Sequence, residues 1–184
     1  AILENASLET IKFLLAQGND VDKLTHDART YIFWAAYKDN LPLMKYLISQ
    51  GAKTEIIDQH GYSLLMFSAV TGQENQAIYD YIIGLGADIE KEKDRHGRNA
   101  LLAYASGMKT GELIDYFIEK GLDVNSVDKN GNGIFNHAAK TGNQELMERL
   151  IADYKVDILK NSATNENAIL FASQRFSRSG QETD

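Results

Sequence analysis

One stretch of the chain has the residue types and the spacing of a calcium-binding loop. The segment Asp128–Gly133, with the sequence DKNGNG, offers side-chain oxygens at alternate positions and a glycine at the sixth. The twelfth position of such a loop needs a glutamate that closes the oxygen shell with both carboxylate oxygens, and here that position is Ala139. The motif is therefore only half present, and we expect no metal at this site.

Other combinations that could support catalysis or cofactor binding fail on spacing. No histidine has a second histidine four residues later, and the chain has no cysteine, so no zinc site is indicated. The pair Gly84 and Gly86 lacks the third glycine of a dinucleotide-binding loop and follows an expected helix instead of a strand. The sequence shows no grouping of nucleophile, base and orienting residue. We therefore expect neither enzymatic activity nor a cofactor.

What the chain does contain is a regular repeat. Glycine ends four expected helices at intervals of 33, 35 and 35 residues, each time shortly after a pair of apolar residues. In a fifth copy the apolar pair Leu150-Ile151 is followed by Tyr154 in place of glycine. The helix-ending glycines are Gly18, Gly51, Gly86 and Gly121.

Two further markers keep the same register. An Asp-x-x-Gly motif begins at Asp58, Asp94 and Asp128, and a pair of small residues, such as Ala35-Ala36 or Ala138-Ala139, lies in the helix that follows. The first copy has Thr25 and Ala28 in place of the Asp and the Gly, and the last has Ser162 and Asn165. Because alanine adopts a left-handed backbone poorly, we expect weak points at Ala28 and, for lack of a closing glycine, at Tyr154.

Together these markers resemble the ankyrin repeat, whose pattern runs Asp-x-x-Gly-x-Thr-Pro-Leu-His-x-Ala-Ala and closes on Gly-Ala-Asp-x-Asn. The closest stretches are 86–90, 121–125 and 131–142. The resemblance implies an all-α, helix-turn-helix solenoid of about four full repeats with partial terminal repeats. Its loops, here called fingers, would line a concave groove. Every copy has lost the Thr-Pro-Leu-His segment, so we expect the family's buried histidine hydrogen bonds to be absent.

The register divides the chain into one array. It predicts a partial repeat at 1–23, repeats at about 24–56, 57–91, 92–126 and 127–160, and a partial repeat at 161–184. Repeat arrays need terminal units with a polar outer face, and both end copies are incomplete. We therefore expect a fragment of a longer chain. The irregular copies and the asparagine-rich loops favour a bacterial source.

In the family that the chain resembles, ligand contacts usually come from the fingers and the outward side of the first helices. Over these groove positions, six Lys or Arg oppose two Asp or Glu, whereas the whole chain carries a net charge of −7. This segregation favours an acidic polypeptide partner, with two tyrosines as aromatic anchors. The expected partner-binding residues are His26, Arg29, Tyr37, Lys38, His60, Tyr62, Arg95, His96, Arg98 and Lys129.

Composition argues against two other classes of function. The chain is 43% apolar but has no apolar run of the about 18 residues that a membrane helix needs. A pI near 5.1 argues against a nucleic-acid binder, because binding to phosphates needs a basic surface. We expect a monomeric, non-catalytic module that binds a protein partner. The alternative is a structural or regulatory repeat segment of a larger multidomain protein.

Trp34 lies beside Ala35 in an expected first helix, and we expect it to stack between helices.

Overall fold

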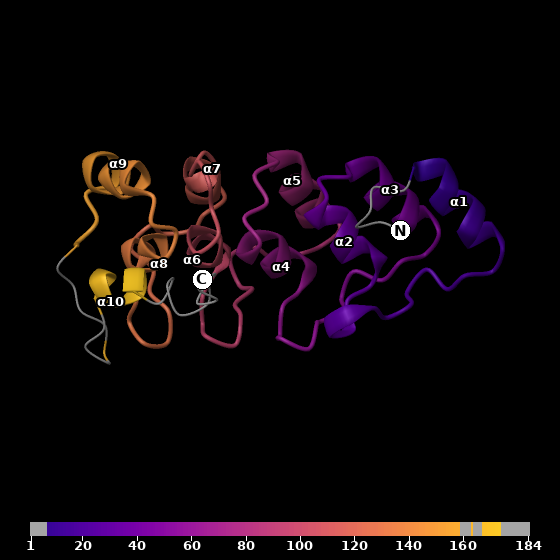
Figure 1. Ribbon diagram of the computed structural model, residues 1–184, viewed down its shortest axis with the longest axis horizontal. Helices are drawn as coiled ribbons and strands as arrows, with labels where there is room; N and C mark the ends of the chain where they lie inside the picture. The colour runs from indigo at the N-terminus through magenta and orange to yellow at the C-terminus, as the bar shows by residue number, and fades with distance from the viewer. Residues whose placement is uncertain (1–6, 159–162, 164–166, 174–184) are drawn as a thin grey trace, which may run out of the picture. The chain divides into compact units, whose positions relative to one another are not determined.

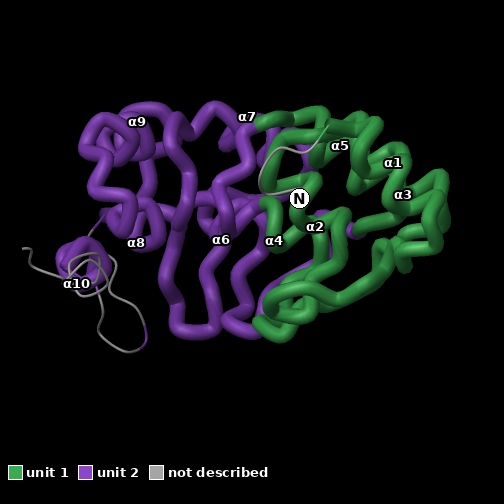
Figure 2. The backbone as a smooth tube through the Cα atoms, turned by 45° about the vertical axis from the view of Figure 1, so that its right-hand side comes forward, with its two compact units in different colours: residues 1–68, 75–87 green, residues 69–74, 88–184 purple. Residues whose placement is uncertain are grey.

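The computed structural model describes residues 7–158, 163 and 167–173, and every regular element in these residues is helical (Figure 1). The expected all-α fold built from helix-turn-helix repeats is therefore confirmed. The chain divides into two compact units (Figure 2). Unit 1 comprises residues 1–68 and 75–87, and unit 2 comprises residues 69–74 and 88–184.

Each full repeat has a short first helix, a tight turn and a second helix. The first helices are α2 (Tyr31–Tyr37), α4 (Leu64–Val70), α6 (Ala100–Ala105) and α8 (Ile134–Ala139). The second helices are α3 (Leu41–Ser49), α5 (Gln76–Gly84), α7 (Leu113–Glu119) and α9 (Gln144–Tyr154). The two end copies contribute α1 (Leu8–Ala16) and α10 (Ala168–Ser173), and a one-turn 3-10 helix, η1 (His26–Ala28), lies in the first finger. Ser162, Asn165 and the polar stretch from 174 to 184 lie outside the described residues.

The Asp-x-x-Gly marker shapes the fingers through hydrogen bonds within its own loop. The Oδ1 atom of Asp58 accepts the backbone N–H groups of His60 and Tyr62, each at 2.9 Å, and Gly61 between them has φ +84°. Glycine reaches this left-handed region without steric cost. The same pattern recurs at Asp94 and Asp128, which accept the N–H groups two and four residues on. The fingers are Thr25–Arg29, Asp58–Tyr62, Asp94–Arg98 and Asp128–Asn132.

The first finger lacks both marker residues and is held differently. The backbone N–H and the hydroxyl of Thr25 both donate to the carbonyl oxygen of Arg29 at 2.7 Å. Asp27 and Ala28 have φ of +61° and +57°, so the chain forces alanine into the left-handed region that the other fingers reserve for glycine. A left-handed backbone costs an ordinary residue about 1–2 kcal/mol.

We expect Ala28→Gly to raise the free energy of unfolding by about 0.5–1 kcal/mol, because the relief of backbone strain exceeds the added entropy of the unfolded chain. Urea unfolding followed by circular dichroism measures the change. Ala77→Gly, at an exposed site in the first turn of α5, is the control and should lower stability by up to about 1 kcal/mol. Equal losses at both sites would mean that Ala28 is not strained.

Glycine ends the second helices as the repeat period predicted. Gly18, Gly51, Gly86 and Gly121 have φ between +87° and +108°, and each donates its N–H to a carbonyl in the last turn of the helix before it. Gly84 and Gly86 are confirmed as part of such a helix end. At α9, which has no closing glycine, Lys155 takes the left-handed position with φ +51°.

Each unit has a core built from its paired helices. In unit 1, α2 packs against α3, and the small residues Ala35 and Ala36 of α2 are fully buried. In unit 2, α6 contacts α7 and α8, while α8 also contacts α9 and α10. The rings of Tyr104 on α6 and Phe117 on α7 lie 5.4 Å apart there. These buried helices hold the fingers at fixed positions within each unit.

Candidate functional site

Neighbouring fingers are joined by a backbone hydrogen bond at the same position in each unit. In unit 1 the N–H of Gln59 donates to the carbonyl oxygen of Asp27 at 2.9 Å. In unit 2 the N–H of Lys129 donates to His96 at 2.9 Å, and the N–H of Ala163 donates to Asn130 at 2.7 Å. The carbonyl always belongs to the third residue of a finger. This regular bonding holds the finger side chains in place before any partner arrives.

Arg29, an expected partner-binding residue, is held inside unit 1. Its Nε and Nη2 atoms lie 2.8 and 2.7 Å from Oδ2 of Asp58, and Nη1 lies 2.9 Å from Asp27. The guanidinium group also lies 4.4 Å from the ring centroid of Phe67 and 5.4 Å from that of Trp34. Only 9% of Arg29 is exposed. Its charge is neutralised by carboxylates of the protein itself.

Aromatic residues of unit 1 surround that buried arginine. Trp34 lies 5.9 Å from Phe67 on the next first helix, and its Nε1 donates to the Thr25 hydroxyl at 2.6 Å, so the expected stacking between helices is confirmed. Tyr37 packs on both rings, at 6.4 Å from Trp34 and 6.3 Å from Phe67, yet 47% of it remains exposed. We call Trp34, Tyr37 and Phe67 the aromatic cluster.

The other expected residues of unit 1 lie at its surface. His26 is exposed, and Lys38, His60 and Tyr62 are half-buried. The rings of His60 and Tyr62 lie 6.4 Å apart, and Nε2 of His60 is 3.4 Å from a carboxylate oxygen of Asp27. Lys38 caps the C-terminal end of α2, directly after Tyr37.

In unit 2, Arg98 is also internal. Its Nε and Nη2 atoms bind Oδ2 of Asp94 at 2.8 and 2.7 Å, and Nη1 donates to the hydroxyl of Ser106 at 3.1 Å. The Asp94 side chain is completely buried, and that of Arg98 is 9% exposed. Aspartate four residues before arginine within one finger was the sequence signal that could have predicted this pair.

Three exposed residues of unit 2 form what we call the cationic patch: Arg95, His96 and Lys129. Lys129 Nζ donates to the carbonyl oxygen of Arg95 at 2.9 Å, and Arg95 Nε donates to Nε2 of His96 at 3.2 Å. Among the residues that the structure describes, neither Arg95 nor Lys129 has a carboxylate within ion-pair distance. The patch therefore presents two cations whose charge is not neutralised within the described chain.

Unit 2 also contains a Ser-His-Asp grouping that we did not expect. His137 Nε2 lies 3.1 Å from Oδ2 of Asp128, and Nδ1 lies 3.4 Å from Oγ of Ser106. The family's own histidine position holds Asn136, but a histidine outside that pattern is buried here and makes hydrogen bonds that we did not predict from the sequence. His137 lies one position after the site that the family pattern reserves for histidine, and packing against the preceding repeat buries it.

This grouping is built for structure and not for acyl transfer. The His137 side chain is only 3% exposed, so a substrate has no access to its ring. The Ser106 hydroxyl accepts a hydrogen bond from Arg98 and also contacts the carbonyl oxygen of Leu102 at 3.3 Å. Burial lowers the pKa of His137 most strongly, although the hydrogen bond to Asp128 opposes that shift.

In the segment that resembles half of a calcium-binding loop, the Asp128 carboxylate already accepts hydrogen bonds from groups of the protein. The carboxylate of Asp128 accepts the N–H groups of Asn130 and Asn132, the amide of Asn132 and the ring of His137. Burial would raise the pKa of Asp128, but these hydrogen bonds hold it well below its usual range. The described part of the chain contains no cluster of three or more histidine, cysteine or acidic residues suited to a metal.

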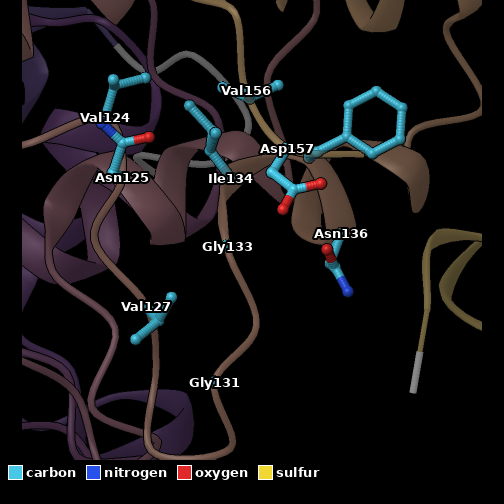
Figure 3. Close-up of a pocket in the computed structure, with 10 residues that line it drawn as sticks. Val124, Asn125, Val127, Gly131, Gly133, Ile134, Asn136, Val156 and Asp157 are labelled. Carbon is cyan, nitrogen blue, oxygen red and sulfur yellow. The ribbon is translucent and has the colours of Figure 1, made fainter. Parts of the chain in front are cut away.

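A pocket in unit 2 lies at the start of α8 (Figure 3). Its volume is about 130 Å³, and its walls include Val124, Val127, Ile134 and Val156 together with the polar Asn136 and Asp157. Sites for drug-sized ligands occupy about 300–1,000 Å³, so this pocket is too small for a cofactor. In the described residues, no helix combines the length and the apolar character that crossing a bilayer requires.

Comparison with known proteins identifies the kind of repeat. A family model for ankyrin repeats, spanning three copies, matches residues 1–93. The chain is 28% identical over 157 residues to an L-asparaginase of Dirofilaria immitis, covering 83% of this chain and 26% of that protein. It is 27% identical over 160 residues to the phosphocholine transferase AnkX of Legionella pneumophila, covering 86% and 16%. A palmitoyltransferase of Lachancea kluyveri is 24% identical over 171 residues, covering 91% and 23%. The chain thus spans about a quarter or less of the length of these relatives.

Proposed function

Because the chain belongs to the ankyrin repeat family, we propose that it is a non-catalytic module that binds an acidic polypeptide along the groove side of its fingers. Ankyrin repeats generally mediate protein–protein interaction. The proposal adds the chemistry of the partner and the residues that contact it, and it takes the chain as one array of repeats that binds as a monomer.

The cationic patch is the observation that carries the proposal. Arg95 and Lys129 are exposed on adjacent fingers of a chain whose net charge is −7, and no carboxylate of the described residues lies within ion-pair distance of either. Arginine fits carboxylates through paired hydrogen bonds, and opposite charge speeds the encounter of two proteins. The exposed ring of His96 adds a third polar group to the same surface.

The aromatic cluster supplies the anchor in unit 1. Tyr37 packs on two rings and still exposes nearly half of its surface, with Lys38 beside it. Exposed tyrosine on a preformed surface is common among residues that dominate binding energy. Arg29 and Arg98 stay outside the binding set in this proposal, because their charges are already paired and buried.

A second candidate role is a structural or regulatory segment within a larger multidomain protein. The length of the relatives favours it, since the matched region makes up only 16–26% of them. The two roles differ in one measurable property, because a spacer requires no selective contact at the cationic patch.

The test uses two double variants. The finger variant carries Arg95→Glu and Lys129→Glu. The control carries Lys53→Glu and Lys109→Glu, which change the net charge equally at exposed sites outside the fingers. Selection from a random peptide library on the wild-type protein should enrich peptides rich in Asp and Glu. We expect the finger variant to bind the selected peptides about tenfold more weakly and the control to bind them unchanged. Thermal melts verify that both variants are folded.

Peptides without an acidic bias would contradict the acidic partner. Equal binding by the two variants would show that the cationic patch does not contact the partner. Failure of the wild-type protein to select any peptide would favour the structural segment instead.

A further inference from the structure

A single buried imidazole links three parts of unit 2. His137 lies on α8, and its Nε2 atom bonds Asp128 in the finger Asp128–Asn132. Its Nδ1 atom faces the hydroxyl of Ser106 at the C-terminal end of α6. The ring of Phe171 on α10 lies roughly perpendicular to the imidazole, with the two centroids 5.6 Å apart and an interplanar angle of 89°. A finger and the last described helix therefore both contact one titratable group.

Two cations near this ring oppose its protonation, and one carboxylate favours it. Arg98 reaches the same Ser106 hydroxyl at 3.1 Å, and Lys140, one residue past α8, stands 4.8 Å from the Phe171 ring centroid. Asp128 is the facing anion, while Asp94 is paired with Arg98. Neither α6 nor α10 contains a charged residue, and the charged residues of α9 are exposed or half-buried. A proton on Nδ1 would therefore point at an oxygen that already binds a cation.

The protonation states follow from burial and hydrogen bonding. Burial lowers the pKa of His137 from its ordinary value of 6.5, and Arg98 and Lys140 lower it further against the opposing effect of Asp128. The Asp128 carboxylate stays ionised, because donors from His137 and Asn132 outweigh the effect of its own burial. At neutral pH the neutral imidazole thus donates from Nε2 to Asp128 and keeps Nδ1 unprotonated.

We propose that His137 is an acid-sensitive latch, whose protonation releases α10 and the finger Asp128–Asn132 from α8. Once the packing opens, the ring enters water and takes up the proton that the closed state disfavours. Below the ordinary pKa of 6.5, the opened state therefore binds more protons than the closed state. The hydrogen bonds of neutral His137 thus stabilise the closed state fully above that pH, and this stabilisation is lost as the pH falls. Lys129 lies on the released finger, so acid would also weaken the cationic patch. That last consequence rests on the proposed function, whereas the latch does not.

Amide hydrogen exchange followed by NMR, corrected for intrinsic rates, tests the latch at about pH 7.5 and about pH 5.5. The reporters are the N–H of Phe171, which donates to Asn167, and those of Asn130 and Asn132, which donate to Asp128. We expect their opening equilibrium constant to rise up to about tenfold in wild-type protein at the lower pH. In His137→Gln, whose amide can still donate to Asp128 but cannot titrate, the rise should stay below about twofold.

A second measurement keeps the test independent of how well that variant folds. The imidazole of His137 in wild-type protein, followed by NMR, should remain neutral until the pH falls below 6.5. A pKa at or above 6.5 would overturn the latch, and so would equal pH dependence of exchange in the wild type and in His137→Gln. Neither result bears on peptide binding, so failure of the latch is distinct from failure of the proposed function.

Discussion

Arg29→Leu is expected to lower the free energy of unfolding by about 3–5 kcal/mol, although arginine on a loop is ordinarily tolerant of change. The Asp58 side chain that it binds is completely buried, and Arg29 supplies the two nitrogens nearest to its Oδ2 atom. Removing the guanidinium leaves an uncompensated buried carboxylate and takes the cation from the faces of Phe67 and Trp34.

Denaturant unfolding of two further variants isolates the ion pair. Arg95→Leu removes an exposed arginine from another finger and should change stability by less than about 0.5 kcal/mol. Arg29→Leu combined with Asp58→Asn should recover part of the loss, because the amide carries no charge and can still accept the N–H groups of its own finger. A loss no larger in Arg29→Leu than in Arg95→Leu would contradict the buried pair.

Gly72→Ala is expected to cost about 4 kcal/mol or more, the range of exceptional single substitutions. Gly72 follows α4 with φ +68°, and an added Cβ would lie 2.2 Å from the carbonyl oxygen and 2.8 Å from the carbonyl carbon of Gly107. Both are backbone atoms of the next turn in unit 2, so no side-chain rotation relieves the overlap. The turn before α7 would have to move as a whole.

Gly51→Ala separates this clash from the cost of the left-handed backbone. Gly51 has φ +87°, but nothing lies within 4 Å of its added Cβ. We therefore expect it to lose only about 1–2 kcal/mol. Urea unfolding of the two variants side by side measures the difference, which reports the backbone contact alone. Similar losses would show that the two turns are not in close contact.

The fate of the ten expected binding residues separates local from long-range information. Exposure was predicted correctly for Arg95, His96 and Lys129, since a short motif with its own carboxylate and glycine orients the finger that carries them. The predicted exposure was wrong for Arg29 and Arg98, which are buried. The repeat register predicts where the Cα atom of a residue lies, but not where its side chain points. A long arginine side chain can turn back to a carboxylate of the protein, and for Arg29 that carboxylate lies 29 residues away in the sequence.

By itself the sequence determined the repeat length, the helix pairs, the turns and the finger loops. Each depends on residues within a few positions, such as Gly51 at the end of α3 or Asp58 and the N–H groups of its own loop. Only the tertiary structure decided which charges are neutralised and which remain available. Ser106 and His137 lie 31 residues apart, and Gly72 contacts Gly107. Such pairs meet because one repeat stacks on the next, and the free energy of burial then selects side-chain partners that no local pattern specifies.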